Sequence, residues 1–242
     1  LGIQYIRNDI FLNKDDKSIS TYEKWFKNME ENDINFIALL TTPMTVDGIY
    51  GHNNIIDNEE DLKLFINKVN LFNNKYPNIK NWEILNEPNN FFNDQNSIYY
   101  YSKLNELLLK QNKDKEILTG SLLTDKGFYW ENFANNLFKQ NKYIEQISFH
   151  HYDFNYELEN KYKNEFLKKT ENDLLNIENN NGGFIQNSVT EFGQTLTDEM
   201  DDNTQVNSII TKETVLNQYN NKFKIIYDLR DDGTNKSKKD MQ

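Results

Sequence analysis

Two glutamates lie where apolar segments of the chain end. Glu87 follows the segment 82–86 and precedes Pro88, which cannot continue a strand ladder and so fixes the exit of the chain. Glu191 lies near the end of the apolar segment 184–192. A pair of carboxyl groups at strand ends can divide acid–base work, because one can donate a proton while the other, ionised, attacks.

The elements that would position these glutamates alternate along the whole chain. Nearly continuous apolar runs predict strands covered on both faces at residues 2–10, 35–42, 81–86, 116–123, 146–151, 184–192 and 223–229. Amphipathic segments predict helices at residues 20–33, 57–74, 96–112, 126–141, 161–179 and 198–221. This alternation indicates an α/β fold with a parallel sheet.

A closed barrel and an open doubly wound sheet both fit this pattern, and periodicity alone does not separate them. No Gly-rich phosphate loop follows any of the apolar runs, which counts against the nucleotide-binding open sheets. The length of 242 residues is close to the roughly 250 residues that a (β/α)8 barrel usually takes. We therefore expect a (β/α)8 TIM barrel, forming one catalytic domain over residues 1–242, with both glutamates on its rim.

Composition excludes several classes of partner. The net charge of −11 repels nucleic acid phosphates and acidic membranes, so neither is expected to bind. No run approaches the roughly 20 apolar residues of a membrane span. The chain has no cysteine, which excludes disulfides and thiolate metal sites. No His, Asp and Glu cluster has ligand spacing, so we expect neither a metal nor a cofactor.

Two carboxylates on one barrel rim suit the hydrolysis of a glycosidic bond. One would protonate the leaving oxygen, and the other would attack the anomeric carbon. Either glutamate alone has a simpler explanation, a negative charge near a helix N-terminus. The two together, each at a strand end, favour a catalytic pair.

The segment Asn86-Glu87-Pro88 after a Trp-containing strand, with a later Glu-Phe-Gly strand end, resembles the clan A glycoside hydrolases. It looks closest to the β-xylosidase and α-iduronidase type family and its cellulase-like relatives, over essentially the whole chain. The resemblance implies retention, with the acid/base after strand four and the nucleophile after strand seven. Counted from Glu87 as strand four, Glu191 falls on strand seven. A β-linked carbohydrate is the implied substrate.

The resemblance extends to further positions. Asn86 matches the asparagine that binds the sugar 2-hydroxyl, and Arg7 matches an arginine behind the nucleophile. His150 and Tyr152 match a His-x-Tyr strand end, which implies contacts to the substrate or to the nucleophile. A buried, hydrogen-bonded core histidine remains an alternative for His150, and a salt bridge at the barrel mouth remains one for Arg7.

The chain departs from these relatives near its end. They usually carry Trp where this chain has Ile226, which leaves Tyr227 as a weak replacement for the aromatic floor under the sugar. Aromatic residues near the rim, at positions 91–92 and 128–130, could wall sugar subsites but more often attach a helix start to the barrel.

Only two apolar runs precede the one that ends at Glu87, so the first strand of a clan A barrel is missing. The polar tail after Gly233 stops without a last helix. We therefore expect a barrel that lacks its first strand and its C-terminal end, a chain truncated on both sides. Two rival functions remain open: a transglycosylase using the same glutamates, and a non-catalytic carbohydrate-binding barrel, which the presence of both glutamates disfavours.

Overall fold

The structure is a computed structural model of the whole chain. It describes residues 4–12, 22–41, 56–92, 94–124, 128–151, 159–193, 206–207, 209–210, 213 and 221–226. The side chains of residues 128–129 and 159–168 lie outside that description.

Within the described residues, seven parallel strands form one sheet in which every strand pairs with the next one along the chain. They are β1 (Tyr5–Phe11), β2 (Asn35–Thr41), β3 (Asn81–Asn86), β4 (Glu116–Leu123), β5 (Gln146–His151), β6 (Gln186–Phe192) and β7 (Asn221–Ile226). Pairing in sequence order with helical crossovers is the topology of a (β/α) barrel. All seven strands were predicted from the apolar runs, with boundaries that differ by up to three residues.

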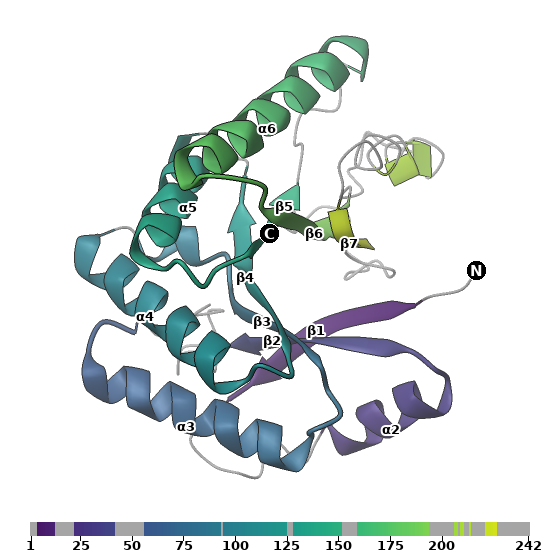
Figure 1. Cartoon of the computed structure of the whole chain (residues 1–242). Helices are drawn as coiled ribbons and strands as arrows, with labels where there is room; N and C mark the ends of the chain where they lie inside the picture. The colour runs from purple at the N-terminus through teal and green to yellow at the C-terminus, as the bar shows by residue number, and fades with distance from the viewer. Residues whose placement is uncertain are drawn as a thin grey trace, which may run out of the picture.

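Helices connect the strands on the outside of the sheet. They are α2 (Glu23–Glu31), α3 (Glu59–Lys75), α4 (Gln95–Gln111), α5 (Phe128–Gln140) and α6 (Glu159–Asn181), with the short 3-10 helix η1 (Pro88–Asn90) after β3. Figure 1 shows α3, α4, α5 and α6 following one another around the sheet. The described residues of the predicted helix 198–221 are helical up to Glu213, and β7 already begins at Asn221.

The helix starts show why these segments fold where they do. Asn58 accepts hydrogen bonds from the backbone of Glu60 and Asp61 and so begins α3. Asp94 does the same for α4. The described part of α2 begins at Glu23 after Tyr22, whose side chain makes no capping hydrogen bond, and the start predicted at Ser20 lies outside the described residues.

The sheet is curled, so that its two edge strands approach each other. Tyr5 of β1 and Phe223 of β7 meet edge to face, with ring centroids 4.9 Å apart. Together with Ile37 and Leu118 they form a small apolar cluster on the concave side. No hydrogen-bonded pairing joins β1 to β7 within the described residues. The expected barrel with one strand fewer than eight is therefore confirmed for this part of the chain.

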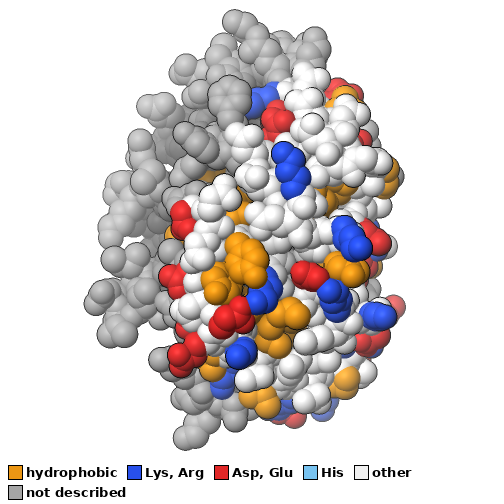
Figure 2. All heavy atoms as spheres, turned by 60° about the vertical axis from the view of Figure 1, so that its left-hand side comes forward, with side chains coloured by type: hydrophobic (Ala, Val, Ile, Leu, Met, Phe, Trp, Pro, Cys, Tyr) orange, Lys and Arg blue, Asp and Glu red, His pale blue; other side chains and the backbone are white. Residues whose placement is uncertain are grey.

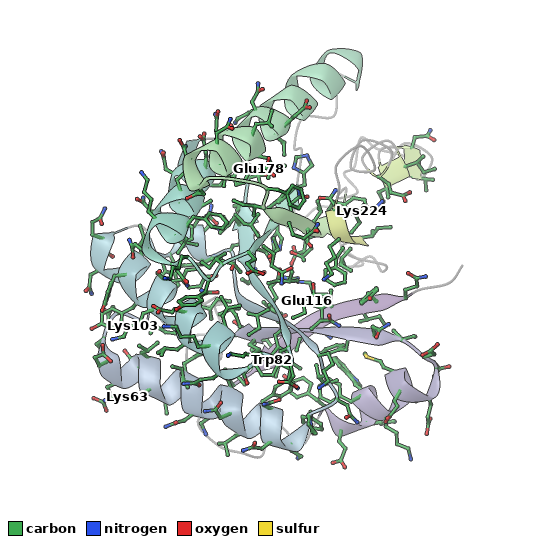
Figure 3. The ribbon with its side chains drawn as sticks, viewed as in Figure 1. Lys63, Trp82, Lys103, Glu116, Glu178 and Lys224 are labelled. Carbon is green, nitrogen blue, oxygen red and sulfur yellow. The ribbon has the colours of Figure 1, made fainter. Side chains whose placement is uncertain are left out.

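The main core lies between the convex side of the sheet and the helices. Trp82 is fully buried there, packed against Phe72 of α3, with its indole N–H donating to the carbonyl of Ile79. Figure 3 labels this side chain between the sheet and α3. Beyond the core, α6 ends at Asn181. The backbone N–H of Gly183 donates to the carbonyl of Glu178, and the Glu178 carboxylate accepts the backbone N–H of Ile185, which leads the chain into β6.

The outer surface of the helices is mixed in charge. Figure 2 shows basic and acidic side chains interspersed, with single apolar groups among them. Lys103 of α4 pairs with Glu59 of α3, and Lys110 lies over the Tyr143 ring at 4.5 Å. None of the helices in the described part of the chain is long and apolar enough to cross a membrane.

Candidate active site

The segment that follows β3 builds one side of the site. Pro88 starts η1, and the short turn brings Asn90 back so that its amide donates to Oε2 of Glu87 over 2.9 Å. Asn89 clamps the turn to the end of β4, because its side chain both donates to the carbonyl and accepts from the N–H of Leu123, each over 2.9 Å. The side chain of Glu87 is thereby held at the carboxyl end of the sheet.

A backbone irregularity in β3 lets two of its residues face the same partner. Glu83 and Asn86 are an odd number of residues apart, so a regular strand would place them on opposite faces. Both nevertheless contact Arg7. Leu85 between them has φ of 64°, and Glu87 has φ of 45°, both in the left-handed region that is costly for residues with a side chain.

The neighbouring strand and helix leave room for this irregularity. A Cβ atom on Gly120 of β4 would lie 2.1 Å from the carbonyl oxygen of Ile84, closer than any real contact. The hydroxyl of the buried Tyr101 donates to the same oxygen over 3.0 Å. Glycine at position 120 is therefore required by the close approach of the β3 backbone.

A second irregularity turns Glu191 toward the same region. In the pairing of β5 with β6, Phe149 faces Val189 while the next residue, His150, faces Glu191, so β6 has one extra residue there. Bulges of this kind redirect side chains and are frequent beside active sites. Their effect is visible in adjacent residues, since Thr190 donates to the Ser121 hydroxyl over 2.9 Å and Glu191 contacts Arg7.

Arg7 contacts more of the side chains at this site than any other residue described above. Its Nε donates to Glu83, and its Nη1 donates to Oε1 of Glu191 over 2.5 Å. Its Nη2 reaches Oδ1 of Asn86 at 3.0 Å and the Ser121 hydroxyl at 3.1 Å. Burial alone would lower the pKa of the guanidinium, but Glu83 and then Glu191 raise it above its usual value, so Arg7 is a permanent cation.

Glu83 is a third carboxylate that the sequence analysis did not single out. Its side chain is 0% exposed. Burial alone would raise the pKa of the carboxyl, but the Arg7 guanidinium, His150 and two serine hydroxyls lower it below its usual value, so Glu83 is ionised. One of those hydroxyls, from Ser148, donates to Oε1 over 2.6 Å. A charged residue inside the run 82–86 was the signal available in the sequence.

His150 lies between the two glutamates. Its Nδ1 is 2.9 Å from Oε1 of Glu87, and its Nε2 is 3.3 Å from Oε1 of Glu191. The Nε2 atom also lies 3.4 Å from Nη2 of Arg7. One fully buried imidazole therefore joins the two carboxylates, which places them at the same end of the sheet.

Five of the seven residues proposed from the sequence come together in this cluster: Arg7, Asn86, Glu87, His150 and Glu191. The other two, Tyr152 and Tyr227, lie outside the described residues. The alternative kept for Arg7 was a salt bridge, and Arg7 does form one with Glu191. The alternative kept for His150 was a buried, hydrogen-bonded histidine, and His150 is one. Those contacts are made to the two glutamates, so both descriptions hold at once.

The rim aromatics that the structure describes belong to the core. Phe92 and Trp130 are fully buried, against Tyr101 and Phe149 respectively, and the Trp130 indole donates to Asp173. Ile226, where the relatives usually carry Trp, is 39% exposed at the end of β7. Phe92 and Trp130 therefore attach helices to the sheet. No group of three or more His, Asp or Glu side chains in the described residues could hold a metal ion.

No protein-family model and no curated protein sequence matches this chain. Solved structures do. The chain is similar to a family 39 glycoside hydrolase from the gut symbiont Bacteroides cellulosilyticus WH2, with a TM-score of 0.69 and 16% identity over 96% of this chain and 52% of that one. A fungal β-1,4-galactanase superposes with a TM-score of 0.63 and 14% identity, over 93% of this chain and 77% of the other.

A GH5-4 broad-specificity endoglucanase from Clostridium longisporum is a third such structure, with a TM-score of 0.63 and 10% identity over 93% of this chain and 71% of that one. The chain spans about half the length of the family 39 structure. At these identities the likeness establishes the fold. The fold is a (β/α) barrel like that of these glycoside hydrolases, here with seven strands described, and the fold that the sequence resemblance implied is confirmed.

Proposed function

We propose that this chain is the catalytic barrel of a retaining glycoside hydrolase that cleaves β-linked glycosides of an oligo- or polysaccharide. Glu87 is the general acid/base and Glu191 the nucleophile. The observation that carries the proposal is the placement of the two carboxylates. Glu87 follows β3 and Glu191 lies near the end of β6, three strands along the same sheet, and the two touch opposite nitrogens of the same imidazole.

The surroundings of the two glutamates support different roles. Glu191 has a side chain that is 8% exposed and accepts from Nη1 of Arg7, so its carboxylate is paired with a cation and held in one orientation. Glu87 has a side chain that is 20% exposed, and its Oε1 lies 2.9 Å from Nδ1 of His150. A group that must reach a leaving oxygen and later a water benefits from the greater exposure.

The reaction then runs in two balanced steps. In the first, a carboxylate oxygen of Glu191 bonds to the anomeric carbon, the bond to the leaving oxygen breaks, and Glu87 gives that oxygen a proton. In the second, Glu87 takes a proton from water, the water oxygen bonds to the anomeric carbon, and Glu191 leaves as a carboxylate. In this proposal Asn86, whose Oδ1 accepts from Nη2 of Arg7, binds the sugar 2-hydroxyl.

The test uses the two glutamate variants on a panel of aryl β-glycosides. Glu191→Gln should abolish turnover of every substrate. Glu87→Ala should lose most activity, by about 10²–10⁴-fold, on glycosides with poor leaving groups, and retain formation of the glycosyl-enzyme from dinitrophenyl glycosides, which need no proton. Added azide should rescue Glu87→Ala and yield a β-glycosyl azide.

The matched control is Glu106→Gln on the outer side of α4, where the carboxylate pairs with Lys110 at the surface. This variant should keep wild-type kinetics. Identical behaviour of Glu191→Gln and Glu87→Ala across leaving groups would contradict the assigned roles. A wild-type chain that binds oligosaccharides without turning over any glycoside would instead favour a carbohydrate-binding barrel.

A further inference from the structure

Arg7 carries one positive charge but bonds to two carboxylates. Glu83 bonds to it directly through Nε and Glu191 through Nη1. Glu83 plays no part in the two-step reaction, because its fully buried carboxylate is already occupied by Arg7 and Ser148. Burying an ionised group is costly unless it is paired, so its presence here needs a reason.

The reaction changes the charge of only one of these partners. Glu191 is an anion in the free enzyme and a neutral ester in the glycosyl-enzyme. Without a second carboxylate, each turnover would leave the buried guanidinium of Arg7 without a bonded counter-charge. The negative charge that appears on Glu87 in that step lies on the far side of His150, bonded to Nδ1.

We propose that Glu83 is a positioning residue that holds Arg7 against Glu191 and keeps the Arg7 charge paired while Glu191 is esterified. This inference rests on the proposed function. The geometry of the guanidinium supports it, because the bond to Glu83 uses Nε, so the Nη1 bond to Glu191 can be lost without releasing the arginine. Ser148 fixes the other oxygen of Glu83.

Other charged groups near Arg7 contribute less to its charge balance. Asp9, two residues along β1, stabilises the arginine cation more weakly than Glu83 or Glu191 does. His150 contacts Nη2 of Arg7 only through Nε2, at 3.4 Å. Glu83 is therefore the one described carboxylate, apart from the nucleophile, that bonds directly to the guanidinium.

Removing the charge of Glu83 and removing that of Arg7 should have opposite effects on the two chemical steps. In Glu83→Gln, ester formation leaves the Arg7 guanidinium without a bonded carboxylate. Glycosylation therefore slows and deglycosylation speeds up. In Arg7→Gln, the anions Glu83 and Glu191 lie together without a cation, and ester formation relieves their repulsion. Glycosylation is then favoured relative to deglycosylation. A residue that only supports the fold would slow both steps in each variant.

The experiment measures both steps with 2,4-dinitrophenyl 2-deoxy-2-fluoro-β-glycosides of glucose, xylose and galactose, using the sugar that labels the wild-type chain fastest. The rate constant of inactivation reports glycosylation, and the rate constant of reactivation, after excess reagent is removed, reports deglycosylation. The ratio of the inactivation rate constant to the reactivation rate constant should fall roughly tenfold or more in Glu83→Gln. It should rise by a similar factor in Arg7→Gln, because one unit charge close to Glu191 is uncompensated in each variant.

Two further variants control the result. The double variant Arg7→Gln/Glu83→Gln carries neither charge, so its ratio should return toward that of the wild type. Ser148→Ala removes the hydroxyl that orients Glu83 but keeps both charges, and should displace the ratio less than Glu83→Gln. If Glu83→Gln does not fold, the comparison of Arg7→Gln with the double variant carries the test.

Shifts of the ratio in the same direction in both single variants would overturn the inference and leave the proposed function standing. So would a double variant displaced as far as Arg7→Gln. A wild-type chain in which none of the three reagents labels Glu191, judged by mass spectrometry of its peptides, would overturn the proposed function and this inference with it.

Discussion

Oε1 of Glu87 lies 2.9 Å from Nδ1 of His150, and this contact ties the group that must exchange protons to a fully buried imidazole. The other carboxylate oxygen of Glu87 accepts from Asn90 over 2.9 Å. The carboxyl group is thus held at both oxygens, which limits the directions in which it can deliver a proton.

The first prediction concerns that imidazole. His150→Asn should lower kcat by about 10²–10³-fold, because a shorter amide cannot touch both Glu87 and Glu191 and each catalytic group loses orientation. Steady-state kinetics on an activated aryl β-glycoside measures the loss. His151→Asn is the matched control, since His151 packs on the Phe149 side of the strand. Equal kcat losses in the two variants would remove His150 from the catalytic cluster.

The second prediction is stereochemical. Retaining enzymes hold their two carboxyl groups about 5–5.5 Å apart, whereas inverting enzymes need about 6.5–9.5 Å to admit a water. Because the proposed reaction is retaining, we expect the shorter separation between the carboxyl groups of Glu87 and Glu191. Proton NMR during hydrolysis should show the β-anomer of the sugar first, and added methanol should give a methyl β-glycoside. Initial formation of the α-anomer would mean inversion.

The third prediction tests the support of the β3 irregularity. Gly120→Ala should destabilise the protein by at least about 1–3 kcal/mol, the usual cost of overpacking, because the new methyl group meets the Ile84 carbonyl rather than a movable side chain. Urea denaturation followed by circular dichroism measures the free energy of unfolding. A variant as stable as the wild type would show that β3 can relax away from β4.

The fourth prediction tests the hydrogen bond from Tyr101 to the same carbonyl. Tyr101→Phe should cost about 0.5–1.5 kcal/mol of the free energy of unfolding, the net value of a typical hydrogen bond. Tyr100→Phe, one residue earlier on α4, keeps its ring beside Lys103 and should change stability by less. If both substitutions had the same effect, the Tyr101 hydroxyl would not be holding the strand.

The fifth prediction follows from the lowered pKa of Glu83. A carboxyl whose pKa is lower in the folded than in the unfolded chain stabilises the fold above its unfolded value, and that contribution is lost as the pH falls through the folded value. Glu83→Gln should therefore lower the free energy of unfolding by about 3–5 kcal/mol at pH 7, the cost of breaking a buried pair. The difference should shrink below the ordinary carboxyl value of 4.5.

Denaturation of wild type and Glu83→Gln at pH 7, 5, 4 and 3 measures this dependence, with Glu106→Gln as a surface control that should differ little at any pH. A difference that stayed constant down to pH 3 would mean that the substitution acts through packing, not through the charge of Glu83.

The order of strands and helices could be predicted from the sequence, and the reason is physical. Strands covered by helices on one side and by the barrel interior on the other are buried on both faces, so they appear as continuous apolar runs. Glu87 directly after the run 82–86, and Glu191 next to the end of the run 184–192, were also visible in the sequence. Helix starts were predicted less closely: Asn58 and Asp94 cap α3 and α4, whereas the predicted helices began at residues 57 and 96.

What the sequence by itself determined is therefore the alternation of elements and the two strand-end carboxylates, because each depends on neighbours within a few residues. The tertiary structure alone decided which side chains meet. Arg7 pairs with Glu83 and Glu191 over separations of 76 and 184 residues. Moreover, the positive φ of Leu85 and the extra residue in β6 break the two-residue alternation from which a strand's facing side chains are deduced. Those irregularities are held by contacts between strands, such as Gly120 against Ile84, and such contacts exist only after the sheet has formed.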